Sequence, residues 1–184
     1  MLVLAKIGRN DVAYRLLFND TYPSWGFEIK NGASSIWERW NGWTAQDGFA
    51  DPGMNSFAHY SFGAVYQWMF ENIGGIQNVP AGFKDIIIHP LPDKRLKYVK
   101  TTFNSINGKI ETHWKLDNNK FILSVTIPAN TTACLLLPAK APDAVTESDK
   151  PLGKAQGVKF LRMENGCAVI NLESGTYNFI SQMP

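Results

Sequence analysis

The spacing of the apolar residues changes once along this chain, near residue 80, and this change limits the fold more than any other feature. Before it, apolar side chains recur at the three- and four-residue intervals of helices. From Phe83 onward they alternate with polar ones, as in strands with one buried and one solvated face. The charge changes at the same place: residues 1–80 carry 5 Lys/Arg and 7 Asp/Glu, and the rest carry 13 and 9. We therefore expect two unlike pieces, helices over residues 1–80 and antiparallel β-structure over residues 81–184.

The first piece is expected to consist of short helices and loops. Residues 2–7 fit the end of a helix that stops at Gly8, and Asn10-Asp11 fits the N-terminal cap of a helix that ends near Phe18. A third short helix is expected over residues 23–30, with Gly32 at its exit. Residues 41–55, which are rich in glycine and proline, are expected to form a loop.

The longest helix is expected from about Ser56 to Asn72, capped by Asn55 or Ser56 and ended by Gly74-Gly75. Its apolar residues lie on most of its sides, so it needs neighbours on several faces: Phe57, Phe62, Ala64, Val65, Trp68, Met69 and Ile73. The few short helices of this piece do not supply them. We infer a missing partner, and we expect self-association of the chain through the incomplete face that carries Val65, Trp68 and Met69.

Turn sequences divide the second piece into about eight short strands. Asn107-Gly108 is typical of a β-hairpin, and Asp117-Asn118-Asn119 and Pro128-Ala129-Asn130 are typical of the turns that follow. The alternation is clearest over residues 110–116, and further strands are expected at 121–127, 131–137, 158–163, 167–172 and 176–180. Strands of this number and spacing predict a β-sandwich.

Composition excludes several classes of protein. The net charge of +2 gives no basic surface of the kind that binds nucleic acid, and no apolar run approaches the ~20 residues that cross a bilayer. The 6 Trp, 6 Tyr and 11 Phe are incompatible with disorder. Since there is no Gly-rich phosphate loop and no metal-ligand spacing, we expect no cofactor and no metal.

Cysteine content and the start of the chain say less. Cys134 and Cys167 each lie in an apolar run, which fits two buried free thiols or a disulfide between neighbouring strands. The first residues lack the basic region and the long apolar stretch of a secretory signal. If the chain is a piece of a larger protein, that absence says nothing about the compartment, so the localisation is left open.

The densest cluster of reactive and aromatic residues is Trp37-Glu38-Arg39-Trp40 and its neighbour Trp43. Indole faces stack on the apolar faces of sugar rings, and a carboxylate can activate water or stabilise positive charge at an anomeric carbon. The other interpretation is that Glu38 pairs with Arg39 or a nearby lysine while the tryptophans pack as core. Both interpretations are open on these residues alone.

His59 is expected at the start of the longest helix. The charged form of a histidine is disfavoured near a helix N-terminus, so a neutral imidazole that hydrogen-bonds a ligand hydroxyl fits this position, as does a purely structural histidine. His89 and His113 lack a partner pattern, and we assign them no role.

Three stretches of the first piece form a recognisable set: Tyr22-Pro23-Ser24-Trp25-Gly26, Ser35-Ile36-Trp37-Glu38-Arg39-Trp40, and the segment from Ser56 to Val65 with sequence SFAHYSFGAV. They resemble the last part of the bacterial α-L-rhamnosidases. Gly82-Phe83-Lys84, Ile88-His89-Pro90 and the segment from Ile127 to Ala133 continue the resemblance over nearly the whole chain, in order and with matching spacing.

This resemblance implies a fold and a chemistry. Residues 1–80 would be the closing helices of a catalytic α/α six-hairpin barrel, and residues 81–184 a C-terminal β-sandwich. The family hydrolyses terminal α-L-rhamnose with inversion. Glu38 matches its general base, His59 matches a histidine that contacts the sugar, and Trp37 and Trp40 are candidates for sugar platforms. A rhamnose-containing carbohydrate is the implied partner.

Two departures bear on activity. Ala58 stands where the family often has Asn. The general acid of the family comes from an earlier part of the barrel, and only Asp47 and Asp51 lie near Glu38 in sequence, with nothing to mark either as an acid. We therefore expect a fragment of a glycoside hydrolase that is inactive alone. The alternatives are a non-catalytic carbohydrate-binding or interaction module, and a related α/α-barrel glycosidase with another sugar preference.

Overall fold

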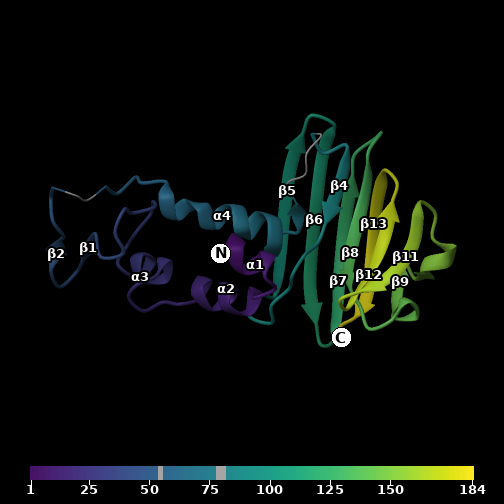
Figure 1. Cartoon of the computed structure of the whole chain (residues 1–184), viewed down its shortest axis with the longest axis horizontal. Helices are drawn as coiled ribbons and strands as arrows, with labels where there is room; N and C mark the ends of the chain where they lie inside the picture. Colours follow the sequence, from purple (N-terminus) through teal and green to yellow (C-terminus); the bar gives the residue numbers. More distant parts are fainter. Residues whose placement is uncertain (54–55, 78–81) are drawn as a thin grey trace. The chain divides into compact units, whose positions relative to one another are not determined.

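The computed structural model of the chain describes residues 1–53, 56–77 and 82–184. It divides into two compact units, Met1–Trp68 and Met69–Pro184. Figure 1 shows the helices of the first unit and the long strands of the second. No helix among the described residues is long and apolar enough to span a bilayer.

The first unit contains short helices joined by irregular backbone. Its elements are α1 (Leu2–Lys6), α2 (Asn10–Leu17), α3 (Trp25–Lys30), the two-residue strands β1 (Trp43–Thr44) and β2 (Gly48–Phe49), the 3₁₀ turn η1 (Ser61–Ala64) and α4 (Val65–Trp68). The three N-terminal helices are confirmed. The loop expected over residues 41–55 contains the β1–β2 pair, in which Trp43 lies opposite Phe49.

Two caps differ from expectation in instructive ways. Arg9, not Asn10, precedes α2, and no side chain caps that helix. In α3 the cap is Ser24, whose Oγ accepts the N–H of Phe27 at 3.0 Å, so Pro23 lies before the helix. Gly26 is required here because a Cβ would lie 2.8 Å from the Cα of Asp20.

The longest helix begins five residues later than predicted, so the expected cap at Ser56 is wrong. It starts as η1 at Ser61, with Tyr60 as an N-cap that makes no side-chain bond, and Asn55 lies outside the described residues. The cause is long-range: the backbone of Ser56 and His59 is hydrogen-bonded to Glu38 and Ile36 and is unavailable to a helix. Local sequence could not show this competition.

The face predicted for self-association also needs correction, because Trp68 is fully buried. The ring of Tyr14 in α2 lies edge-on to it, with centroids 5.2 Å apart. Trp68 therefore packs within the chain and is no part of an exposed surface.

The second unit opens with one π-helical turn, η2 (Met69–Ile73), and then contains two sheets. The first sheet has the order β10-β9-β13-β7-β6-β5, and the second has the order β11-β12-β8-β4-β3. The strands are β3 (Ile76–Gln77), β4 (Asp85–Ile88), β5 (Tyr98–Ser105), β6 (Gly108–Asp117), β7 (Lys120–Ile127), β8 (Thr132–Pro138), β9 (Val145–Glu147), β10 (Lys150–Pro151), β11 (Val158–Glu164), β12 (Cys167–Leu172) and β13 (Gly175–Gln182). Short 3₁₀ turns, η3 (Pro142–Ala144) and η4 (Leu152–Lys154), flank β9 and β10.

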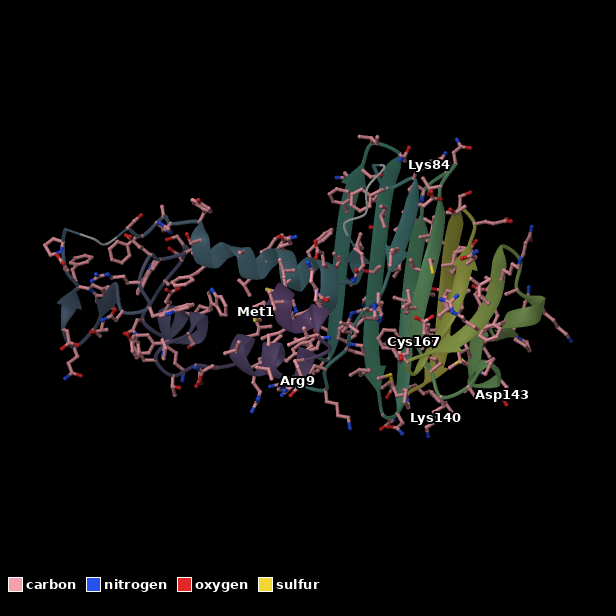
Figure 2. All side chains as sticks on the ribbon, viewed as in Figure 1. Met1, Arg9, Lys84, Lys140, Asp143 and Cys167 are labelled. Carbon is pink, nitrogen blue, oxygen red and sulfur yellow. The ribbon has the colours of Figure 1, made fainter. Side chains whose placement is uncertain are left out.

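The alternation predicted from the sequence is confirmed in the core. Every second residue is buried from Ile110 to Trp114 in β6 and from Phe121 to Ile127 in β7, and Leu116 is half-buried. The pairs are antiparallel except β4 with β8, which run parallel. Figure 2 shows this direction: Lys84, just before β4, and Lys140, just after β8, lie at opposite ends of the strands.

The two cysteines are free thiols. They lie on the neighbouring strands β8 and β12, but Cys134 is opposite Asn171 and Cys167 is opposite Pro138. Because this register separates them by four residues along the strands, roughly 13 Å, they are far beyond the span of a disulfide. Cys167 is buried as expected, whereas Cys134 is half-buried.

Candidate active site

Two distant backbone segments meet in the first unit and carry the candidate residues. The N–H of Glu38 donates to the carbonyl of Ser56 at 2.8 Å, and the N–H of His59 donates to the carbonyl of Ile36 at 2.8 Å. The hydroxyl of Ser35 donates to the carbonyl of Phe57. These bonds hold residues 35–38 beside residues 56–59, so Glu38 and His59 lie on adjoining stretches of chain.

The Glu38 side chain takes part in the same pairing. Its Oε2 accepts the N–H of Ser56 at 2.9 Å, and the residue is half-buried. Among the described residues no ion pair joins Glu38 to Arg39 or to a lysine. A backbone donor therefore orients the carboxylate, and the alternative in which Glu38 serves a structural ion pair is not observed.

His59 lies two residues before the helix, rather than in its first turn. Its Nδ1 accepts the N–H of Ser61 at 3.4 Å, and its ring is parallel to that of Tyr60 with centroids 5.7 Å apart. An imidazole that accepts through Nδ1 carries its proton on Nε2 when neutral. His59 can thus present a hydrogen-bond donor to a hydroxyl group.

The two predicted tryptophans make packing contacts. Trp37 is 5% exposed and meets the edge of Phe57 at 5.1 Å between centroids. Trp40 is half-buried and stacks on Phe62 at 3.9 Å, with Trp25 edge-on at 5.1 Å. The Nε1 of Trp25 also donates to the carbonyl of Phe62 at 3.2 Å. One face of Trp40 is therefore covered by a phenyl ring.

The two aspartates on the neighbouring loop are engaged within their own turns. Asp47 Oδ2 accepts the hydroxyl of Thr44 at 3.1 Å, and Asp51 Oδ1 accepts the N–H of Gly53 at 2.8 Å. Both residues are exposed. Nothing in these contacts marks either as the second carboxyl group of a glycosidase.

Sequence reasoning missed Glu28, a carboxyl group in α3 that is 2% exposed. Its Oε1 has no hydrogen-bond partner within the described part of the chain, and burial raises its pKa to about 7. A glutamate between Phe27 and Ile29 in a helix of six residues gives no hint of this burial, because so short a helix does not fix which side faces inward.

No other region of the described chain offers a competing centre of this kind. No group of three His, Cys, Asp or Glu side chains in residues 1–53, 56–77 and 82–184 could hold a metal ion. A cavity of about 720 Å³ lies in the second unit, bordered by β4, β8, β11 and β12, and no residue of the candidate site lines it.

Two models of one protein family match this chain, one over its first part and one over its second. The family model described as the bacterial alpha-L-rhamnosidase 6 hairpin glycosidase domain matches residues 1–73. The model described as the bacterial alpha-L-rhamnosidase C-terminal domain matches residues 75–151. The expected fold class, closing helices of a six-hairpin barrel followed by an antiparallel β-sandwich, is thereby confirmed.

Individual relatives match most of the chain. It is 40% identical over 177 residues to an alpha-L-rhamnosidase of Streptomyces avermitilis, and 37% identical over 177 residues to one of Formosa agariphila. Each match covers 96% of this chain, and 16% and 19% of the respective relative.

Solved structures match equally well. The crystal structure of the Streptomyces avermitilis alpha-L-rhamnosidase complexed with L-rhamnose superposes with a TM-score of 0.88 at 39% identity, over 98% of this chain and 17% of that one. The structure of the alpha-L-rhamnosidase from Dictyoglumus thermophilum superposes with a TM-score of 0.84 at 33% identity, over 98% of this chain and 20% of that one. The chain thus spans a fifth or less of the length of these relatives. Both family models and these matches show that it belongs to the bacterial α-L-rhamnosidase family.

Proposed function

We propose that this chain is the C-terminal part of an inverting glycoside hydrolase that releases terminal α-L-rhamnose, with Glu38 as its general base. The observation that supports the proposal is the pairing of residues 35–38 with 56–59: a carboxylate oriented by a backbone N–H lies on one segment, and His59 lies on the adjoining one. The relative from Streptomyces avermitilis, crystallised with L-rhamnose, supports rhamnose as the sugar.

The chemistry assigns a role to each residue. Glu38 takes a proton from the attacking water, and the Nε2–H of His59 donates to a sugar hydroxyl. Trp40, and to a smaller extent the more deeply buried Trp37, provide apolar surface for the sugar ring. Inversion needs a second carboxyl group about 6.5–9.5 Å from the base, with water between them. Asp47 and Asp51 each accept a hydrogen bond within their own turn, and these contacts do not mark either as the general acid. The isolated chain should therefore not turn over substrate.

We propose a division into two domains together with this function. Residues 1–80 would close the catalytic barrel and residues 81–184 would form the C-terminal β-sandwich. The division by compactness falls earlier, between Trp68 and Met69, inside a continuous helical stretch. Self-association of the isolated chain also stays a prediction, which sedimentation at high protein concentration tests.

The first test has two readouts, hydrolysis of an aryl α-L-rhamnoside and binding of L-rhamnose at millimolar concentration followed by amide NMR shifts. We expect no hydrolysis by the chain, and L-rhamnose shifts at residues 36–40 and 56–60 that weaken in His59→Ala. Glu38→Gln should leave the shifts in place. Asp47→Asn is the matched control, because it neutralises an exposed carboxylate in the same unit.

Two outcomes would contradict the proposal in different parts. If the chain hydrolyses the substrate and Glu38→Gln abolishes this activity, the predicted inactivity of the isolated chain is wrong, while the role of Glu38 as general base is supported. Shifts that are confined to other residues, or that D-glucose reproduces equally, would remove Glu38 and His59 from a rhamnose site.

A non-catalytic carbohydrate-binding module is the second candidate, favoured by the half-buried Trp40 in the Trp25–Trp40–Phe62 cluster. It predicts sugar affinity that survives Glu38→Gln and falls in Trp40→Ala. A related glycosidase with another sugar preference would instead bind a different monosaccharide in the same titration.

A further inference from the structure

Two lysines and a histidine on the outer face of the six-stranded sheet have no part in the proposed catalysis. Alternation along β5 and β6 places Lys100, His113 and Lys115 on the solvated face, while Trp114 is buried. In the strand register Lys100 lies opposite His113, and Lys115 lies opposite Tyr98. The four outer side chains, Tyr98, Lys100, His113 and Lys115, are all exposed. We call these four residues the cationic patch.

Lys100 and Lys115 occupy diagonal positions on either side of His113. Both lysines help to lower the pKa of His113, after the larger effect of its desolvation, so the positive charge of the patch comes from the two lysines. Within the described residues no ion pair neutralises either lysine. The two ammonium groups are therefore not held by a carboxylate of the described chain.

The acidic residues of the same β6 face are already engaged. Glu111 pairs with Lys109 at 3.1 Å, and Asp117 Oδ1 accepts the side-chain amide of Asn118 at 3.1 Å. Neither carboxylate is paired with the patch. Lys100 and Lys115 are therefore open to an anionic ligand.

A shallow depression of about 250 Å³ adjoins the patch and is rich in hydroxyl groups. Its lining on this face is Lys100, Thr102, Glu111, His113, Ser124 and Thr126. The row of hydroxyls continues onto β13, where Thr176 lies 3.2 Å from Thr126, Oγ1 to Oγ1. Hydroxyl groups both donate and accept, as a sugar requires of its neighbours.

An aromatic ring completes the surface. Tyr98 is 63% exposed, and its ring lies edge-on to His113 with centroids 6.4 Å apart. An exposed tyrosine offers an apolar face and a polar tip, which suits the apolar face of a pyranose ring. The side chains of Lys100 and Lys115 start from diagonal positions about 7–8 Å apart, on either side of this Tyr98–His113 contact.

We propose that the cationic patch and its depression bind a saccharide chain that bears carboxylate groups. The carboxylates lie between Lys100 and Lys115, a sugar ring lies against Tyr98, and hydroxyls meet Thr102, Ser124 and Thr126. Glu111, on the far side of the depression, repels a carboxylate and so sets the direction of the chain. Nucleic acid is disfavoured because β5, β6, β7 and β13 contain no arginine, the residue best suited to phosphate.

The test titrates the full chain at low salt with a short oligogalacturonate, its methyl-esterified counterpart and a DNA duplex. We expect the esterified oligomer to bind about tenfold more weakly or worse, because charge-assisted hydrogen bonds are lost. The double variant Lys100→Gln/Lys115→Gln should lose about tenfold in affinity, and Tyr98→Ala about fivefold. Binding should weaken as salt is raised.

The matched control is Lys154→Gln/Lys159→Gln, which removes the same net charge from exposed positions outside the patch. We expect its affinity to stay within about twofold of the parent chain. An equal loss in both double variants, equal binding of the esterified oligomer, or equal binding of DNA would overturn the proposal. Unchanged amide shifts of β12 would show that each variant is folded.

This surface stands apart from the proposed hydrolysis. The oligogalacturonate contains no rhamnose, and Glu38→Gln should bind it like the parent chain. A failure of rhamnose binding at Glu38 and His59 would leave this proposal intact, and the reverse also holds.

Discussion

The two units of this protein are stabilised in different ways. In the second unit, backbone ladders join the eleven described strands β3 to β13 into two sheets around a continuous core of alternating residues. In the first unit the buried apolar residues among those described are few, namely Ala13, Tyr14, Trp37 and Trp68. Its helices have eight residues or fewer. Edge-to-face contacts between aromatic rings, and side chains that hydrogen-bond to backbone groups distant in sequence, help to hold it together.

This difference bears on where the candidate active site lies. A sheet ladder satisfies backbone groups among themselves, whereas the irregular segments 35–38 and 56–59 bring a carboxylate and an imidazole onto neighbouring backbone. Functional groups commonly lie on such irregular segments, positioned by the elements around them. The less regular unit therefore carries the candidate active site.

The largest expected effect is in the sheet core. Trp114 is fully buried and its Nε1 donates to the carbonyl of Ile73 at 2.7 Å. Trp114→Ala should cost about 3–5 kcal/mol, because it leaves a cavity and an unpaired carbonyl. Trp40→Ala in the first unit should cost about 2 kcal/mol, because that indole is already partly solvated. Denaturant unfolding followed through β7 and α3 amides measures each unit separately, and equal losses would remove the contrast between them.

An intermediate effect concerns pH and the first unit. The folded-state pKa of Glu28, about 7, lies above its ordinary value of 4.5, so the folded chain binds the proton more tightly. Stability from this group is complete below about pH 4.5 and is lost as the pH rises to about 7, by about 3 kcal/mol at most. Glu28→Gln should flatten this slope, and Asp47→Asn should retain it. Identical pH profiles for the parent and Glu28→Gln would show that Glu28 titrates normally.

The smallest effect is a single cap. Ser24→Ala removes the hydroxyl that accepts the N–H of Phe27, and it should cost about 1 kcal/mol. The loss should appear as faster hydrogen exchange at Phe27 and Glu28. Ser34→Ala, an exposed serine in the same unit, is the control. An unchanged exchange rate at Phe27 would mean that the cap contributes nothing to α3.

The same contrast governs how much the sequence could reveal. The hairpin at Asn107-Gly108 and the strands around it were predictable because alternation and turn chemistry are local. The parallel pairing of β4 with β8 was not, since nothing local specifies a partner more than forty residues away. Glu38 and His59 were predicted as site residues from their residue types and from the family resemblance, and they stay predictions. The bonds that delay the helix to Ser61 were not predicted, because they connect residues about twenty positions apart. Glu28 escaped notice because burial is a property of the packed unit.

The contacts of Trp114 and Thr112 have a practical consequence for dividing the chain. Their side chains donate to the carbonyls of Ile73 and Gly74, and β3 pairs with β4. An expression boundary at residue 81 would delete these acceptors together with β3, leaving an indole and a hydroxyl buried with no partner for either. A recombinant β-sandwich should therefore start no later than Met69, and a shorter version would yield aggregates for a reason that its strand sequences alone do not show.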